Sequence, residues 1–163
     1  MTAPHYIEHL QLLPHPEGGY YKESYRSPVT ISASCLPGFD GDRCYSTAIY
    51  FLLQQGDFSA FHRIKSDECW HFYDGGTLLI HVLRNGEYVC TRLGKDVSNG
   101  EVVQFVVPAG AWFASEPAAD TSFALVGCTV APGFDFADFE MAQEENLLQS
   151  FPNYEALIKR LCR

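Results

Sequence analysis

A succession of short strand-like runs between residues 46 and 130 constrains the fold most. Apolar, aromatic and β-branched residues fill each run, and Gly, Asn, Asp or Ser separates it from the next. Turn residues recur about every eight to twelve positions, which is typical of a sandwich or barrel rather than of alternating strands and helices. The pair Asn85-Gly86 predicts a two-residue hairpin turn. The expected strands cover 46–53, 58–64, 68–73, 77–83, 88–93, 101–107, 111–115 and 122–130.

Helical patterns flank these runs on both sides. Apolar residues recur at helical spacing over residues 4–13, and Pro14 would end that helix. Residues 22–26 alternate like a strand, and residues 27–45 are rich in Pro and Gly and predict a loop. Two further helices are expected at 141–149 and 153–162. We therefore expect one domain over residues 1–163, mainly β, in which helices flank an antiparallel barrel.

Composition narrows the function classes. Twenty acidic against eleven basic residues give a formal charge of −9, which argues against nucleic acid and anionic membranes as partners. No apolar run is long enough to span a bilayer, and the first residues do not resemble a secretory signal, so a cytoplasmic location is expected. None of the six cysteines forms a C-x-x-C pair, which excludes a zinc-ribbon or thioredoxin motif and favours free thiols.

The stretch 56–75 carries the clearest chemical signal. It places His62 and Glu68 on two consecutive strand-like runs, which we interpret as a hairpin, with Gly56 and Gly75 at its ends. This spacing resembles the first motif of the cupin superfamily, in which Gly, His-x-His, Glu and Gly follow one another. Three of these positions match after the first Gly, and Ile64 stands where the second His would be.

A second stretch extends the resemblance. Pro108-x-Gly110 matches the core of the second cupin motif, with Phe113 where its His would be, and the leading Gly of that motif is displaced. Nearly the whole chain, from His15-Pro-Glu-Gly-Gly-Tyr-Tyr to Phe139, is similar to a small-cupin family of unknown function (domain of unknown function 985, the fifth cupin subfamily). The resemblance implies a double-stranded β-helix, the RmlC-like jelly-roll barrel, and a homodimer. It implies no settled activity.

Strand alternation predicts which side chains face the barrel interior. An inward His62 would share its face with Phe58 and Ile64, and an inward Glu68 would share its face with Trp70 and Phe72. Together with the second motif, this predicts a ligand pocket that consists of His62, Glu68, Phe58, Ile64, Trp70, Phe72, Phe113 and Tyr50.

The residues of the same two motifs indicate whether the protein can bind a metal ion. Metal-binding cupins use both His and the Glu of the first motif with the His of the second, so Ile64 and Phe113 remove two of four ligands. Catalytic zinc and non-haem iron normally take three protein ligands, so no cofactor is expected, although a divalent metal at His62 and Glu68 stays open. His71 could join only if the alternation breaks, and His81 lies on a later strand whose inward face stays open, because Leu78, Leu79, Ile80 and Val82 are all apolar.

Three functional interpretations follow from a buried His and carboxylate. The first is a metal-independent isomerase, epimerase or lyase acting on a sugar-like or small polar molecule, with His62 as base, because such cupins resemble deoxysugar epimerases. The second is a non-catalytic ligand-binding protein, and the third is a mononuclear metalloenzyme. Asp135 or Asp138 could assist His62, with Tyr50 or Tyr73 as the acid.

Two further features stay open at this point. His15 and Glu17 could line a pocket mouth, but a turn between prolines explains them equally well. The aromatic segment 20–25 could pair across a two-fold axis in the homodimer that the resemblance implies.

Overall fold

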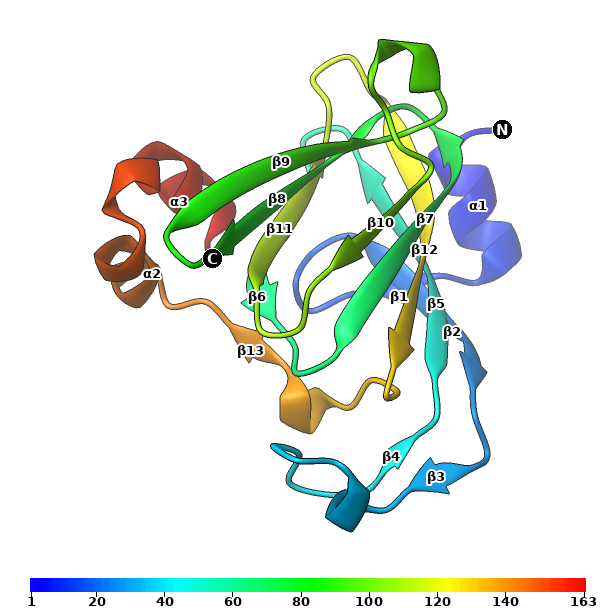
Figure 1. Cartoon of the computed structure of the whole chain (residues 1–163). Helices are drawn as coiled ribbons and strands as arrows, with labels where there is room; N and C mark the ends of the chain where they lie inside the picture. The colour runs from blue at the N-terminus through cyan, green and yellow to red at the C-terminus, as the bar shows by residue number, and fades with distance from the viewer.

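The computed structural model describes residues 1–163 and consists of two antiparallel β-sheets that face each other (Figure 1). The larger sheet contains, in spatial order, β1 (Leu13–Pro14), β2 (Tyr20–Arg26), β5 (Thr47–Gln54), β12 (Phe123–Ala131), β7 (Asp67–Gly75) and β10 (Gln104–Val107). The smaller contains β13 (Glu140–Met141), β6 (Ser59–Arg63), β11 (Trp112–Pro117), β8 (Leu78–Arg84) and β9 (Glu87–Leu93). The expected mainly β barrel is confirmed.

The hairpin expected for residues 56–75 is not observed. The two strands of the stretch 56–75 do not form a hairpin, because β6 belongs to the smaller sheet and β7 to the larger. The chain crosses from one sheet to the other between them. His62 and Glu68 therefore come from opposite walls of the barrel. The hairpin expected at Asn85-Gly86 does form, between β8 and β9, and both turn residues have positive φ (53° and 80°).

Helices cover the outer faces of both sheets. The helix α1 (Ala3–Leu10) ends earlier than predicted, because Gln11 adopts a left-handed conformation, and it packs on Leu52 and Phe123 of the larger sheet. The helices α2 (Glu144–Ser150) and α3 (Glu155–Leu161) pack on Phe61 and Leu83 of the smaller sheet. None of the helices has the length and apolar character needed to cross a bilayer.

The core lies between the sheets and fills one end of the barrel. Trp70 is at its centre, with its ring edge-on to Phe51 (centroids 5.9 Å apart) and to Phe113 (6.1 Å). These three side chains are almost fully buried together with Ile80 and Val126. Because aromatic rings occupy this end, the remaining space lies toward the other end.

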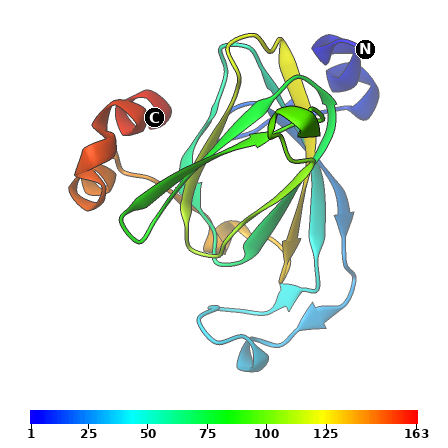
Figure 2. The same ribbon diagram turned by 45° about the horizontal axis from the view of Figure 1, so that its top comes forward.

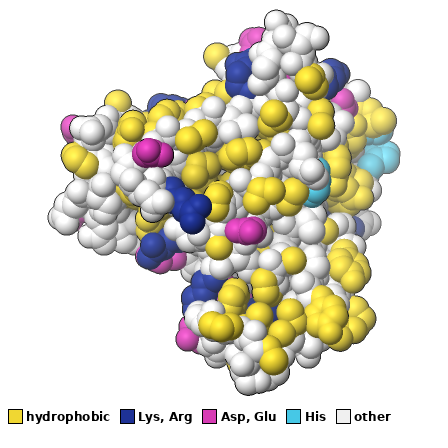
Figure 3. All heavy atoms as spheres, in the orientation of Figure 1, with side chains coloured by type: hydrophobic (Ala, Val, Ile, Leu, Met, Phe, Trp, Pro, Cys, Tyr) yellow, Lys and Arg dark blue, Asp and Glu magenta, His cyan; other side chains and the backbone are white.

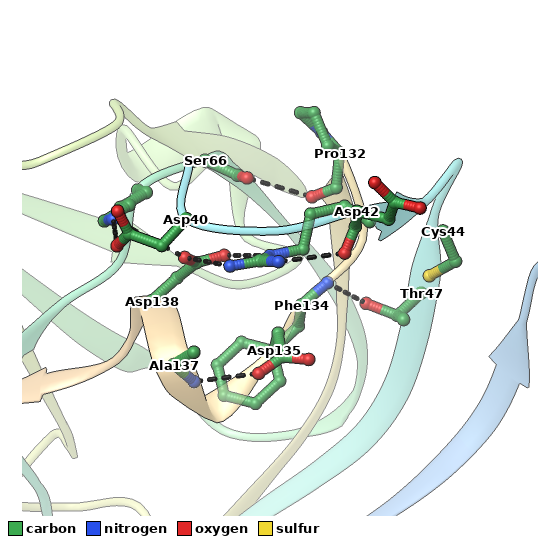
Figure 4. A network of polar contacts seen from close by, with 12 residues as sticks. Asp40, Asp42, Cys44, Thr47, Ser66, Pro132, Phe134, Asp135, Ala137 and Asp138 are labelled. Atoms are coloured by element: carbon green, nitrogen blue, oxygen red, sulfur yellow. Dashed lines mark hydrogen bonds and ion pairs between the residues drawn. The ribbon is translucent and has the colours of Figure 1, made fainter. Parts of the chain in front are cut away.

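The segment 27–45 projects from the barrel as an arm (Figures 1 and 2). It was expected to be a loop, but it contains the short paired strands β3 (Thr30–Ile31) and β4 (Arg43–Cys44). At its base the Arg43 guanidinium donates two hydrogen bonds to the Asp138 carboxylate, 2.6 and 2.7 Å long, and both side chains are buried (Figure 4). Lys65 binds Asp40 of the arm at 2.7 Å and lies 3.9 Å from Asp138. The arm is thus fixed to the 132–139 segment.

On the face seen in Figure 3, charged side chains are scattered singly, and hydrophobic side chains gather over β2, β3 and β4. Tyr25, Val29 and Tyr45, of this region, are each about half exposed. All six cysteines are free thiols.

Candidate functional site

A cavity of about 300 Å³ lies between the two sheets at the end that the core leaves open. Its walls come from the turn before β2, from β2, β5, β6, β7 and β12, and from residues 134–139. Both residues singled out in the first motif, His62 and Glu68, line it. The other titratable lining residues are His15, Glu17, Tyr21, Glu23, Arg26 and Cys128.

His62 is held by both of its ring nitrogens. Nδ1 lies 2.7 Å from the carbonyl oxygen of Ala60, which can only accept, so Nδ1 carries a hydrogen. Nε2 lies 3.0 Å from Oε2 of Glu17. The ring packs against Phe113 and Phe139, with centroids 4.0 and 5.2 Å away. Burial lowers the pKa of His62 to about 3, so the imidazole is neutral and Nε2 is an acceptor.

Glu17 completes this pair as the donor. Its carboxyl is buried, and burial, with the nearby charge of Glu68 as a second cause, raises its pKa well above the ordinary value. A protonated Glu17 donates to Nε2 of the neutral His62. The pair therefore shares one proton without carrying net charge.

Two glycines bring Glu17 to this position. Gly18 and Gly19 have positive φ angles, 114° and 74°, which L side chains rarely adopt. A Cβ at Gly18 would collide with the carbonyl oxygen of Phe58, so only glycine permits this close approach to the backbone just before β6. The backbone N–H of Gly19 also donates to Asp57, at 2.9 Å. The sequence left Glu17 open, and the double glycine that follows it is the signal that could have identified it.

Glu68 is the unpaired acid of the site. It projects from β7 and is buried, and it has neither an ion pair nor a hydrogen bond within normal geometry. Burial raises its pKa to about 7, and the Cys128 thiol and Trp70 indole hold that rise back in part. The Trp70 Nε1 makes no hydrogen bond of normal geometry, so its effect on Glu68 is that of a nearby dipole. At neutral pH the carboxyl is therefore divided between its two protonation states.

His15 stands beside Glu17. Its Nδ1 accepts a long hydrogen bond, 3.3 Å, from the backbone N–H of Glu17, and its ring packs edge-on against Tyr21 (centroids 4.4 Å apart) and Phe51 (5.8 Å). Burial lowers its pKa to about 4, so this imidazole is neutral as well.

The rim combines one ion pair with aromatic rings. Arg26 binds Glu23 at 2.7 Å and donates to the carbonyl oxygen of Phe134 at 3.2 Å. Phe136 packs edge-on against Phe134 and Phe139, with centroids 5.0 and 6.0 Å away. One side of the entrance is consequently apolar, and on the other side the charges of Arg26 and Glu23 neutralise each other.

Of the six residues expected beside His62 and Glu68, only Ile64 lines the cavity. Phe113 supports the His62 ring from the core side, and Trp70 and Phe72 face inward but belong to the packed core. Phe58 packs toward the C-terminal helices. It precedes β6, so the alternation of inward and outward side chains along that strand does not apply to it.

Tyr50 and Tyr73 do not face the cavity. On β5 the inward position belongs to Phe51, so Tyr50 points to the outer face of the larger sheet, where it packs with the residues beneath α1. Tyr73 lies beside it, with ring centroids 6.1 Å apart, and is half exposed. Neither hydroxyl can act as the acid toward His62.

Asp135 and Asp138 also have other partners. Asp138 is engaged by Arg43 at the base of the arm, and the Asp135 carboxylate accepts a hydrogen bond of 2.8 Å from the backbone N–H of Ala137 (Figure 4). Asp135 therefore caps a short 3₁₀ turn, and neither residue contacts His62.

His71 and His81 both lie on outer faces, and neither lines the cavity. His71 contacts Thr129 at 3.1 Å on the outer side of the larger sheet. His81 lies under the C-terminal helices, where Nδ1 is 2.8 Å from the hydroxyl of Tyr88 and Nε2 is 3.1 Å from Glu116.

The donor set does not fit the metal of metal-binding cupins. Ile64 and Phe113 occupy two of the four ligand positions, and Nε2 of His62 is directed at Glu17. Nowhere in the chain are three or more His, Cys, Asp or Glu side chains grouped so that they could hold a metal ion.

Comparisons with known proteins agree with this fold. The uncharacterized protein YML079W from Saccharomyces cerevisiae is 34% identical over 154 residues, which cover 88% of this chain and 76% of the yeast protein. A hypothetical protein from Leishmania major has a structure with a TM-score of 0.91, 38% identity and 99% coverage of both chains. Protein SO0799 from Shewanella oneidensis gives 0.89 and 40%, over 100% of this chain and 98% of that one.

A more distant likeness shows the fold alone. Oxalate decarboxylase from Bacillus subtilis superposes with a TM-score of 0.54 at 15% identity, over 91% of this chain and 36% of the decarboxylase. The family model described as "Cupin superfamily (DUF985)", Cupin_5, matches residues 4–142. This chain, with its two-sheet barrel and its one-sided cavity, therefore belongs to the Cupin_5 family of the cupin superfamily.

Proposed function

We propose that the cavity binds a small polar molecule and that the protein is a metal-independent isomerase, epimerase or lyase in which Glu68 transfers a proton. The observation that carries this proposal is the state of Glu68, a buried carboxyl without a protein partner that lines the cavity. Its pKa of about 7 matches the condition for efficient proton transfer at neutral pH. Perturbed acids in clefts are enriched at functional sites.

In this proposal His62 is a positioning residue and not the base. Both of its nitrogens are engaged, Nδ1 by Ala60 and Nε2 by Glu17, and a pKa of about 3 makes it a weak proton acceptor. The Glu17–His62 pair keeps the wall opposite Glu68 polar but uncharged. Such a wall favours a ligand without a strong charge of its own, because a buried unpaired charge is costly.

A non-catalytic binding protein is the second candidate. The observation that favours it is that the buried Glu17 and His62 of the cavity already bind each other in neutral forms. A neutral polar surface of this kind recognises hydroxyl and carbonyl groups without needing to move a proton.

Deuterium exchange in D₂O separates the two candidates. Small neutral ring compounds and sugars are first screened for binding by ligand-observed NMR, and those that bind are incubated with the wild type, with Glu68→Gln and with the exposed control Glu145→Gln. Exchange into carbon-bound positions that Glu68→Gln abolishes and Glu145→Gln retains supports the enzyme. Binding without exchange supports the binding protein, and no binding across the panel contradicts both.

We also propose a homodimer, formed through the edge of the larger sheet. Only the two-residue β1 pairs with the outer side of β2, and Tyr25, Val29 and Tyr45 expose apolar surface there (Figure 3). Sedimentation equilibrium at micromolar concentration tests this proposal, and a monomer would contradict it.

A further inference from the structure

We propose that His15 is a catalytic hydrogen-bond donor that polarises a carbonyl oxygen, and that the substrate is therefore a compact hydroxycarbonyl compound. This inference rests on the proposed function and deepens it, since it assigns a second group that would act on the ligand together with Glu68 in the same cavity. It uses a residue outside both cupin motifs.

The tautomer of His15 is fixed by its neighbour. Nδ1 accepts from the backbone N–H of Glu17, so the ring hydrogen of the neutral imidazole is on Nε2. The ring cannot turn freely, because Tyr21 and Phe51 pack edge-on against it. Its side chain is only 8% exposed.

The hydrogen on Nε2 has no partner in the protein. No side chain or backbone carbonyl accepts from it, and Nε2 is not enclosed by protein atoms. The atom therefore opens onto the cavity that His15 lines. An acceptor on a bound ligand would give this donor its hydrogen bond.

Donor and base together select the substrate class. A neutral imidazole that donates to a carbonyl oxygen, combined with a carboxylate that removes a proton, suits the enolisation of a carbonyl compound. A cavity of about 300 Å³ is at the lower end of the range for small-molecule sites, which favours a compact substrate. The absence of an unpaired cation in the lining, where Arg26 binds Glu23, favours an uncharged one.

The step balances without an oxidant or reductant. The Glu68 carboxylate takes the proton from the carbon next to the carbonyl, and the electron pair of that C–H bond forms the C=C bond of an enediol. The carbonyl oxygen gains negative charge, which Nε2–H of His15 stabilises. Glu68 then returns the proton to the neighbouring carbon while the hydroxyl proton moves between the two oxygens, so that the carbonyl group changes place.

Histidine NMR on the ¹⁵N-labelled wild type tests this directly. The probes are hydroxyacetone and dihydroxyacetone, and the matched alcohols are 1,2-propanediol and glycerol. We expect His15 in the Nε2–H tautomer and a shift of its Nε2–H signal with the two ketones but not with the alcohols. We further expect deuterium exchange at the carbon next to the carbonyl to fall about 100-fold or more in His15→Phe, to recover in part in His15→Gln, and to persist in the exposed control His9→Phe.

Each other outcome has a separate meaning. The Nδ1–H tautomer at His15, or equal shifts with ketones and alcohols, overturns the role of His15. If the His62 signals respond to both classes while His15 stays unchanged, this inference fails and the proposed site survives. If no probe perturbs His15, His62 or Glu68, the inference fails and the proposed function loses its support as well. The tautomer is read from the wild type, so the test stands even if His15→Phe does not fold.

Discussion

Replacing Glu68 by Gln should make the protein more stable at neutral pH, although it removes a residue from the centre of the proposed site. The folded protein holds the Glu68 proton up to about pH 7, whereas the unfolded chain releases it near the ordinary value of 4.5. The neutral form is favoured in the folded state. Ionisation of Glu68 therefore costs the folded protein stability. This loss is absent below the unfolded pKa, grows as the pH rises from 4.5 to about 7, and is constant above that.

The magnitude follows from the two pKa values. One pH unit corresponds to about 1.4 kcal/mol, so the interval from 4.5 to about 7 amounts to roughly 3 kcal/mol of lost stability in the wild type. Glu68→Gln cannot titrate and avoids this loss. The lowered pKa values of His15 and His62 destabilise the folded protein as the pH falls below about 6.5. Both the wild type and Glu68→Gln retain these residues, so this effect cancels in the difference between them.

Urea unfolding at pH 4, 5, 6, 7 and 8 measures the difference. We expect the gain in stability of Glu68→Gln over the wild type to grow with pH and to level off above pH 7. Glu145→Gln, an exposed change of the same chemistry on α2, should track the wild type throughout. Parallel curves for the wild type and Glu68→Gln would refute the reasoning, because Glu68 would then titrate alike in the folded and unfolded states.

Three further predictions test other parts of the structure. Asp138→Ala should lower the free energy of unfolding by about 3–5 kcal/mol in urea, because it leaves the buried Arg43 guanidinium unpaired, and Asp40→Ala, whose ion pair is exposed, should cost far less. Gly18→Ala should lose about 1–3 kcal/mol from backbone conformation alone, measured by thermal unfolding, and an unchanged midpoint would contradict the role given to its positive φ. Metal analysis of the purified protein should find iron, zinc and manganese well below one ion per chain, and a stoichiometric ion that His62→Ala loses would contradict the reading of the donor set.

The fold could be predicted from the sequence because local patterns and turns agree with it. Alternating apolar runs placed eight strands within a few residues of their observed bounds, and the turn at Asn85-Gly86 has the conformation that its residues demand. The pairing of β6 was not predictable in the same way. The chain between His62 and Glu68 is short enough for a hairpin, and only the packing of the two sheets decides that it crosses between them.

The site was predicted in part, for a related reason. Alternation correctly turned His62 and Glu68 toward the interior, but interior positions at the filled end of the barrel and those at the open end look identical in sequence. Trp70 and Phe72 point inward and still miss the cavity. Glu17 and His15 were left undecided because they lie on a turn, where no periodicity assigns a direction. Their approach to His62 depends on long-range contacts of Gly18 and Gly19 with Phe58 and Leu53.

The position of β12 has a consequence for how the protein folds. This strand pairs with β5 on one side and β7 on the other, although most of the chain has been synthesised before it. Until β12 inserts, the half of the larger sheet next to Glu17 and the half that carries Glu68 are not joined, and both carboxyls stay hydrated. We therefore expect the dehydration of the two acids to wait for this non-local pairing, and we expect folding to be faster in mildly acidic solution, where both carboxyls are protonated.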